Sequence, residues 1–270
     1  MPNSAHSSNR VKGHGWGRSV FGLLKRWRAI PFGLMILTHS AWRGAAFAKS
    51  LDSRNQNGNY VVLIHGLGRS AFSMKAVEWA LRREGYRVIN VSYASTRISV
   101  EAAANGWLAA LLKDRVSDRT AKIHFVSHSL GGIVLRQYLS DNHLENLGRV
   151  VMLAPPNRGS ELADKLQYNI LYKLLTGPAG QQLTTDPGGL TQRLGPATCD
   201  LGIIAGDRSL NPLFSACIPG SDDGKVSVRS TVLAGMQDFL IVHHSHTWMM
   251  WRRDVIHQVR QFLTTGQFGE

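Results

Sequence analysis

One stretch of the chain, residues 121–139, is predicted to form a buried strand, a tight turn and a helix. It opens with a short apolar run of β-favouring residues, Ala121-Lys122-Ile123-His124-Phe125-Val126, of the kind that a parallel sheet buries on both faces. Ser127-His128-Ser129-Leu130-Gly131 follows at once, and apolar side chains at helical spacing continue to Leu139. The order strand, turn, helix favours a fold in which parallel strands alternate with helices.

The turn in this stretch has a chemical consequence. A tight strand-to-helix turn lifts one side chain, that of Ser129, above the sheet and aims the backbone N–H of Leu130 at a developing oxyanion. Positions 127 and 131 need small residues, because bulkier side chains would collide with the neighbouring strand and helix. Glycine is usual at the first of these positions, and Ser127 meets the same steric need.

Several short motifs lie at the ends of predicted strands. There are five: His65-Gly66-Leu67-Gly68, Ser127-His128-Ser129-Leu130-Gly131-Gly132, Pro156-Asn157-Arg158-Gly159-Ser160, Asp223-Gly224-Lys225-Val226 and Ser245-His246-Thr247. Together they resemble the α/β-hydrolases, specifically the small bacterial lipase- and esterase-like members. A lone Ser-x-Ser-x-Gly arises often by chance, whereas these motifs in this order span the chain from Tyr60 to its end.

The resemblance implies a catalytic triad in the chain order serine, acid, histidine. A serine hydroxyl is a poor nucleophile at neutral pH, so Ser129 needs a base, and the base needs an orienting acid. We expect His246 to be the base, since it lies between the last predicted strand and the last helix. His244 is the main alternative and His243 the weaker one.

The acid is expected in the loop after the strand at residues 201–205. Asp207, Asp222 and Asp223 compete for the role. In the family that the chain resembles, the acid directly precedes a Gly-x-Val segment, and this spacing selects Asp223.

The remaining implied site residue is Leu67, whose N–H would stabilise the oxyanion together with that of Leu130. The implied reaction is a two-step acyl transfer that needs no cofactor, and the sequence shows no convincing metal constellation. His128 is expected to point away from the serine hydroxyl, and His124 to be a hydrogen-bonded core histidine.

Strand and helix alternate along most of the chain. Strands are predicted at 60–64, 87–91, 121–126, 147–154, 201–205 and 239–242, and helices at 73–84, 100–112, 131–139 and 248–262. This pattern predicts an α/β fold, in the terms of the resemblance a minimal α/β-hydrolase fold, with about six mostly parallel strands and helices on both faces. Residues 157–196 break the alternation, and we expect them to form a small cap of one amphipathic helix and a loop.

The N-terminal 50 residues carry most of the net positive charge of the chain. The formal net charge is +13, yet eight basic and no acidic side chains precede residue 51, which leaves 23 basic and 18 acidic residues in the rest. The net positive charge therefore does not indicate that the predicted domain, residues 60–270, binds nucleic acid. No basic–aromatic motif accompanies the charge either.

Residues 1–50 also have the layout of a secretory signal peptide. A basic segment from Arg18 to Arg28 precedes an apolar run at 29–37 and Ala46-Phe47-Ala48. The run is far shorter than the ~20 residues that span a bilayer. We expect export to the periplasm or medium, with an N-terminal membrane anchor or a cytosolic tail as alternatives. Residues 51–59 are a polar linker, and Cys199 and Cys217 suit either one disulfide or two buried thiols.

The predicted function is hydrolysis of a small-molecule or lipid carboxylic ester. An acyltransferase or deacylase acting on a cell-envelope lipid or glycan would use the same residues. A non-catalytic binding member of the fold would lack the nucleophile, the base or the oxyanion glycines, and all of these are present. Association with a membrane surface is expected only through the leader.

Overall fold

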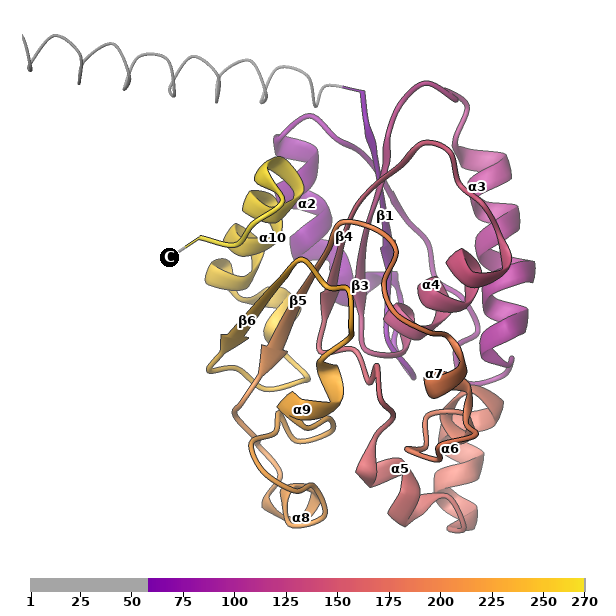
Figure 1. The fold of residues 1–270 in the computed structure, drawn as a ribbon, viewed down its shortest axis with the longest axis vertical. Coiled ribbons are helices and arrows are strands. Elements are labelled where there is room, and N and C mark those ends of the chain that lie inside the picture. The colour runs from indigo at the N-terminus through magenta and orange to yellow at the C-terminus, as the bar shows by residue number, and fades with distance from the viewer. Residues whose placement is uncertain (1–57, 270) are drawn as a thin grey trace, which may run out of the picture. The chain divides into compact units, whose positions relative to one another are not determined.

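An open sheet of six parallel strands forms the centre of the structure, a computed structural model that describes residues 58–269 (Figure 1). The strands are β1 (Tyr60–Ile64), β2 (Arg87–Asn90), β3 (Ile123–His128), β4 (Leu147–Leu153), β5 (Leu201–Gly206) and β6 (Asp238–Val242), in the spatial order β2-β1-β3-β4-β5-β6. All six match predicted strands to within two residues at each end. The predicted leader, residues 1–50, and residues 51–57 of the predicted linker lie outside the described residues.

Helical segments connect the strands. They are η1 (Ala71–Met74), α2 (Lys75–Arg83), η2 (Ala102–Leu108), α3 (Ala109–Arg115), α4 (Leu130–Asp141), α5 (Glu161–Leu166), α6 (Ile170–Gln181), α7 (Leu190–Arg193), α8 (Pro212–Ser215), α9 (Val228–Thr231), η3 (Met249–Trp251) and α10 (Arg253–Thr265). The predicted helix at 100–112 contains a π-helical stretch, η2, before α3. Across residues 58–269, no helix has the length and apolar character that crossing a membrane requires.

Both faces of the sheet are buried. Val62 and Phe125 pack on one face with η2, α3 and α4, whereas Val61 and Val126 pack on the other with α2 and α10, as the flanking helices in Figure 1 show. Each such side chain contributes about 1.5–3 kcal/mol relative to full exposure. Burial on both sides explains why the strands read as continuous apolar runs, and it confirms the predicted doubly wound α/β architecture.

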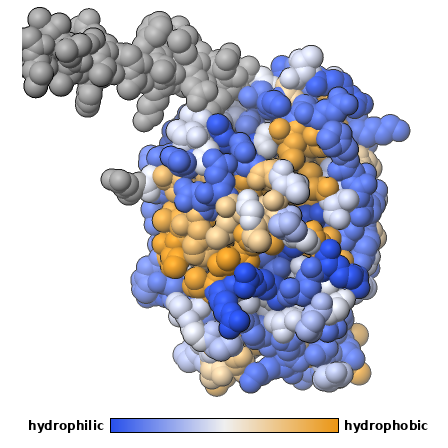
Figure 2. All heavy atoms as spheres, in the orientation of Figure 1, coloured by the Kyte–Doolittle hydropathy of each residue, from blue (hydrophilic) through white to orange (hydrophobic). Residues whose placement is uncertain are grey.

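The strand order decides which loops meet. Because all six strands are parallel, the loops that follow β1, β3, β4, β5 and β6 all leave from the carboxyl ends of the strands, on one side of the sheet. The order reverses between β1 and β3, and ligands bind outside the carboxyl ends of strands at such a point. The outermost of these strands is β6, where Figure 2 shows apolar surface and where Ile241 is half exposed.

The segment predicted as a cap, residues 157–196, contains three helices instead of one helix and a loop. Its central helix, α6, is interrupted at Gly177, which has φ 62° and ψ −163°. Pro178 follows and lacks the N–H that a continuous helix requires. A Cβ at Gly177 would overlap the carbonyl oxygen of Thr96, so glycine lets the kinked helix pack against the loop that follows β2.

Cys199 and Cys217 are free thiols in the structure, and both are partly exposed. Cys199 precedes β5, whereas Cys217 follows α8, beyond the other end of the strand. A strand of this length spans roughly 20 Å, and a disulfide needs its two Cα atoms within about 7 Å. Of the two alternatives left open by the sequence, the structure therefore excludes the disulfide, since the two cysteines lie beyond opposite ends of β5.

Two neighbouring glycines in α4 give a matched test of the packing at the turn. A Cβ at Gly131 would overlap the carbonyl oxygen of Ile64 in β1, whereas at Gly132 its nearest neighbours would be side-chain atoms, the Pro155 Cβ at 3.1 Å, the Met152 Sδ at 3.3 Å and the Ser127 Oγ at 3.4 Å. We expect Gly131→Ala to lower the free energy of unfolding by about 1–3 kcal/mol. Gly132→Ala should be nearly neutral, because alanine gains about 0.5–1 kcal/mol in a helix. Urea unfolding of both variants measures this, and equal stabilities would contradict it.

Candidate active site

Ser129 occupies the turn between β3 and α4 with a backbone conformation that only glycine adopts easily. Its φ is 53° and its ψ is −123°, which costs about 1–3 kcal/mol for a residue with a side chain. The Ser129 N–H donates to the Leu153 carbonyl at 2.9 Å, and the Gly132 N–H donates to the Ser129 carbonyl at 2.9 Å. Bonds from both sides thus hold the strained residue at the apex of the turn.

The structure brings Ser129, His246 and Asp223 together. The Ser129 Oγ lies 2.9 Å from the His246 Nε2, and the His246 Nδ1 lies 2.7 Å from the Asp223 Oδ2. Since an ionised carboxylate only accepts, Nδ1 carries the proton and leaves Nε2 to accept from the hydroxyl. Asp223 Oδ1 accepts from the backbone N–H groups of Lys225 and Val226 at 3.0 and 2.9 Å.

The competing histidines and aspartates pair with other residues. His244 contacts Asp254 at 2.7 Å, and His243 contacts Asp207 at 2.9 Å. Asp222 accepts from the Gly224 N–H at 2.7 Å, which makes it a turn residue. None of these three contacts involves Ser129 or His246.

Backbone bonds also fix the position of His246. Its N–H donates to the Asp223 carbonyl at 3.0 Å, and its own carbonyl lies 3.0 Å from the His128 Nε2, which donates. Asp223 and His128 therefore both hold the main chain of His246.

His128, the residue before Ser129, packs against His246. Its side chain is buried, and its ring centroid lies 4.8 Å from that of His246. Burial, followed by the charge of His246, holds the pKa of His128 well below its usual value. His128 is consequently a neutral donor that positions His246, and only its place beside Ser129 in the motif could have indicated this.

The two leucines expected to supply oxyanion N–H groups lie on either side of the turn. Leu130 is the first residue of α4, where backbone N–H groups have no acceptor within the helix. Leu67 lines the cavity from the loop after β1. Gly66 lets this loop approach, because a Cβ there would lie 2.9 Å from the His128 Nδ1 and 3.1 Å from the Ser129 Cβ.

His65 and Tyr93 support the loop that carries Leu67. The His65 Nδ1 donates to the Gly66 carbonyl at 2.9 Å, and its Nε2 accepts from the Tyr93 N–H at 3.2 Å. The two rings stack with centroids 4.4 Å apart, and the Tyr93 hydroxyl donates to the His65 carbonyl at 3.0 Å. Burial lowers the pKa of His65, so the ring stays neutral in this bonded arrangement.

A cavity of about 350 Å³ opens beside Ser129. Part of its wall is apolar and comes from the predicted cap: Leu162, Ala163, Leu166, Tyr172, Leu175 and Leu183. The rest of its wall includes the polar side chains of Arg69, His128, Lys225 and His246. Residues of the predicted cap and Ser129 therefore share one cavity, which has an apolar wall and a wall that carries basic side chains.

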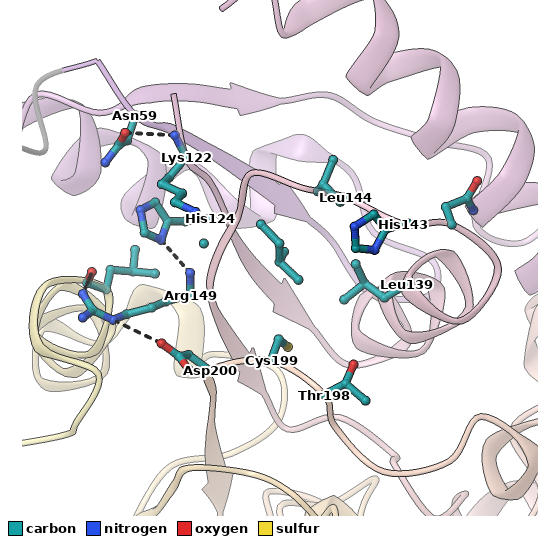
Figure 3. A pocket seen from close by; sticks show the side chains of 14 residues that line it. Asn59, Lys122, His124, Leu139, His143, Leu144, Arg149, Thr198, Cys199 and Asp200 are labelled. Atoms are coloured by element: carbon teal, nitrogen blue, oxygen red, sulfur yellow. Dashed lines mark hydrogen bonds and ion pairs between the residues drawn. The ribbon is translucent and has the colours of Figure 1, made fainter. Parts of the chain in front are cut away.

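A larger hollow of about 740 Å³ lies at the opposite edge of the sheet, where the strands begin (Figure 3). Its side chains are mostly polar, and the figure shows His124 beside Arg149, with Asp200 paired to that arginine. His124 is a buried, hydrogen-bonded histidine, as predicted. Within residues 58–269, no group of three or more His, Cys, Asp or Glu side chains is arranged to hold a metal ion.

Comparison with known proteins places the chain in context. A family model described as "Domain of unknown function (DUF7379)" matches residues 31–197. No curated protein matches the chain. The mature lipase BlEst2 of Bacillus licheniformis superposes with a TM-score of 0.64 at 19% identity, over 77% of this chain and 93% of that one.

Two further solved structures share the fold. The metagenomic carboxyl esterase MGS0156 gives a TM-score of 0.57 at 20% identity, over 72% of this chain and 66% of that one. Phospholipase PlaB from Legionella pneumophila gives 0.54 at 18% identity, over 65% of this chain and 45% of that one. With these likenesses, the parallel sheet is that of an α/β-hydrolase, which confirms the fold that the sequence motifs indicate.

The buried His124 predicts how stability depends on pH. Burial and the charge of Arg149 lower the pKa of His124 to about 4, whereas an unfolded chain has a histidine pKa of about 6.5. The unfolded state therefore binds the proton first on acidification, and His124 should remove about 3 kcal/mol of stability between pH 7 and pH 4.

The variant His124→Asn tests this dependence. It keeps an acceptor for the Arg149 N–H but cannot titrate, so its free energy of unfolding should fall less steeply with acidification than that of the wild type. Denaturant unfolding at pH 7, 5.5 and 4 measures both slopes. Parallel slopes would contradict the burial of a neutral His124.

Proposed function

The chain belongs to the DUF7379 family of domains of unknown function, and we propose that it hydrolyses carboxylic esters through Ser129, His246 and Asp223. The observation that carries the proposal is the continuous chain of hydrogen bonds from the Ser129 hydroxyl through the His246 ring to the Asp223 carboxylate, at 2.9 and 2.7 Å. Nucleophile, base and orienting acid in this relation are the requirement for acyl transfer by a serine.

In the first half-reaction, the Ser129 Oγ attacks the ester carbonyl carbon while its proton passes to the His246 Nε2. The tetrahedral intermediate then breaks its bond to the alcohol oxygen, which takes that proton from His246 and leaves. In the second half, His246 deprotonates a water that attacks the acyl-enzyme, and the acid departs as Ser129 regains its proton. Asp223 stabilises the imidazolium in both halves without accepting a proton.

Oxyanion stabilisation falls to the N–H groups of Leu67 and Leu130. Preorganised donors of this kind contribute about 2.7–4 kcal/mol each when removed singly in related chemistry. The bonding of His65 to Tyr93 and Gly66 holds the Leu67 loop before substrate arrives. This preorganisation is what makes such donors effective in the transition state.

The cavity and the comparisons support the proposed substrate class. Leucines from α5, α6 and the segment before α7 form an apolar wall beside Ser129, which suits the acyl chain of an ester. Proteins of the same fold include a lipase and a carboxyl esterase, which supports ester cleavage over other acyl transfers.

A panel of p-nitrophenyl esters of rising acyl length tests the activity, with the matching thioester and amide beside them. A fluorophosphonate should block the activity and label Ser129 in peptide mapping, and Ser129→Ala should remove both activity and label. A label on another serine, or turnover by Ser129→Ala at the wild-type rate, would refute the proposal.

The role of Asp223 gives a second prediction. Asp223→Asn keeps the shape of the side chain but removes the charge that holds His246 in its reactive tautomer, so kcat should fall about 10⁴-fold. Esterase assays at pH 7 measure this, with circular dichroism to show that the variant is folded.

Asp207→Asn is the matched control for this measurement. Asp207 also contacts a histidine, but that histidine, His243, is exposed. The kcat of Asp207→Asn should therefore differ from that of the wild type by less than about threefold, because most surface substitutions have small effects. If Asp207→Asn were the crippling change and Asp223→Asn the mild one, the assignment of the acid would be wrong.

A further inference from the structure

Two cationic side chains line the cavity that contains Ser129. Arg69 comes from the loop after β1, and Lys225 comes from the loop that carries Asp223. Arg69 is half-buried, whereas part of the longer Lys225 side chain reaches solvent. The proposed ester hydrolysis, as described above, uses neither of them.

Neither cation has a carboxylate partner among residues 58–269. No salt bridge within 4.0 Å involves Arg69 or Lys225 in that part of the chain, and the Arg69 guanidinium donates only to the Thr247 carbonyl, at 3.2 Å. Asp223 is the negative charge that acts on Lys225, but its carboxylate is already occupied by His246 and two backbone N–H groups.

The two positive charges also act on each other. Burial among the surrounding protein atoms, and then the charge of Arg69, lower the pKa of Lys225. Like charges that face one cavity destabilise the empty site, and a bound anion removes this cost. The pair is therefore built to receive negative charge.

The position of the pair relative to His246 tells which end of the substrate would carry that charge. In acyl transfer, the imidazole returns its proton to the departing alcohol oxygen, so the alcohol portion lies on the side of His246. Arg69 bonds to Thr247, the residue after His246, and Lys225 lies two residues after Asp223. The apolar cap supplies the wall for the acyl portion.

Building on the proposed ester hydrolysis, we propose that Arg69 and Lys225 bind an anionic group on the alcohol portion of the substrate. The substrate class is then an apolar acyl ester of an alcohol that bears a phosphate or a carboxylate. Both anions offer oxygen acceptors to an ammonium and a guanidinium, and charge-assisted bonds of this kind are about twice as strong as neutral ones.

Three octanoyl esters with related leaving groups test the inference. Their alcohols are para-hydroxybenzoate, para-hydroxyphenyl phosphate and methyl para-hydroxybenzoate, so that only the last is neutral. Each ester is assayed with the wild type, Lys225→Gln, Arg69→Gln and Arg69→Lys. Lys113→Gln and Arg115→Gln, at exposed positions on α3, are the matched controls for loss of one positive charge.

We expect Lys225→Gln and Arg69→Gln to lower kcat/KM for an anionic ester about tenfold, mainly through KM, and for the neutral ester less than about twofold. Arg69→Lys should recover part of the loss, and the controls should match the wild type. A larger loss with the phosphate ester, or with the carboxylate ester, identifies the anion for which the pair is suited.

Two results would overturn the inference while ester hydrolysis stands: a wild type with no preference for the anionic esters over the neutral one, or variants that lose activity equally on all three. The second result would show that the cations only support the loops of Asp223 and His246. A wild type that cleaves none of the three esters, nor p-nitrophenyl octanoate, would refute the proposed function itself and the inference with it.

Discussion

The strained backbone of Ser129 is the constraint on which the rest of the site depends. A residue with a side chain at φ 53° stays there only if its surroundings supply more than the about 1–3 kcal/mol that the conformation costs. β3 and α4 supply it, because both are buried in the sheet and its helical layer. Gly131 contributes by letting α4 lie directly against the β1 backbone, so the loop of Leu67 meets the same turn.

The position of His246 depends on contacts between the loops that follow β5 and β6. Asp223 and His246 are joined twice, by the ring–carboxylate bond of 2.7 Å and by the backbone bond of 3.0 Å from the His246 N–H to the Asp223 carbonyl. His128 holds the His246 carbonyl from the other side. The histidine is thus fixed at its main chain as well as at its ring, and little conformational entropy remains to be lost when it accepts a proton.

Local patterns were enough to predict most of the fold and the identity of the three hydrogen-bonded residues. The apolar runs that became β1 and β3 are buried on both faces, and the segments that follow β3, β5 and β6 bring Ser129, Asp223 and His246 together at the carboxyl end of the sheet. The features that the sequence did not indicate depend on long-range packing: the bond from His128 to the His246 carbonyl, the kink of α6 against Thr96, and the separation of Cys199 from Cys217 by the length of β5. Sequence spacing does not report such distances.

The placement of Arg69 and Lys225 resolves an electrostatic difficulty of the proposed substrate. An anionic alcohol next to His246 would lie near the negative charge of Asp223, and two unit charges 6 Å apart repel by roughly 3 kcal/mol at an effective dielectric constant of 20. The Asp223 carboxylate accepts from the His246 ring and from the backbone N–H groups of Lys225 and Val226. These bonds offset its negative charge only at close range. Arg69 and Lys225 line the same cavity, so two positive charges offset the single negative charge of Asp223. The site can therefore keep the aspartate that stabilises its imidazolium and still accept a negatively charged leaving group.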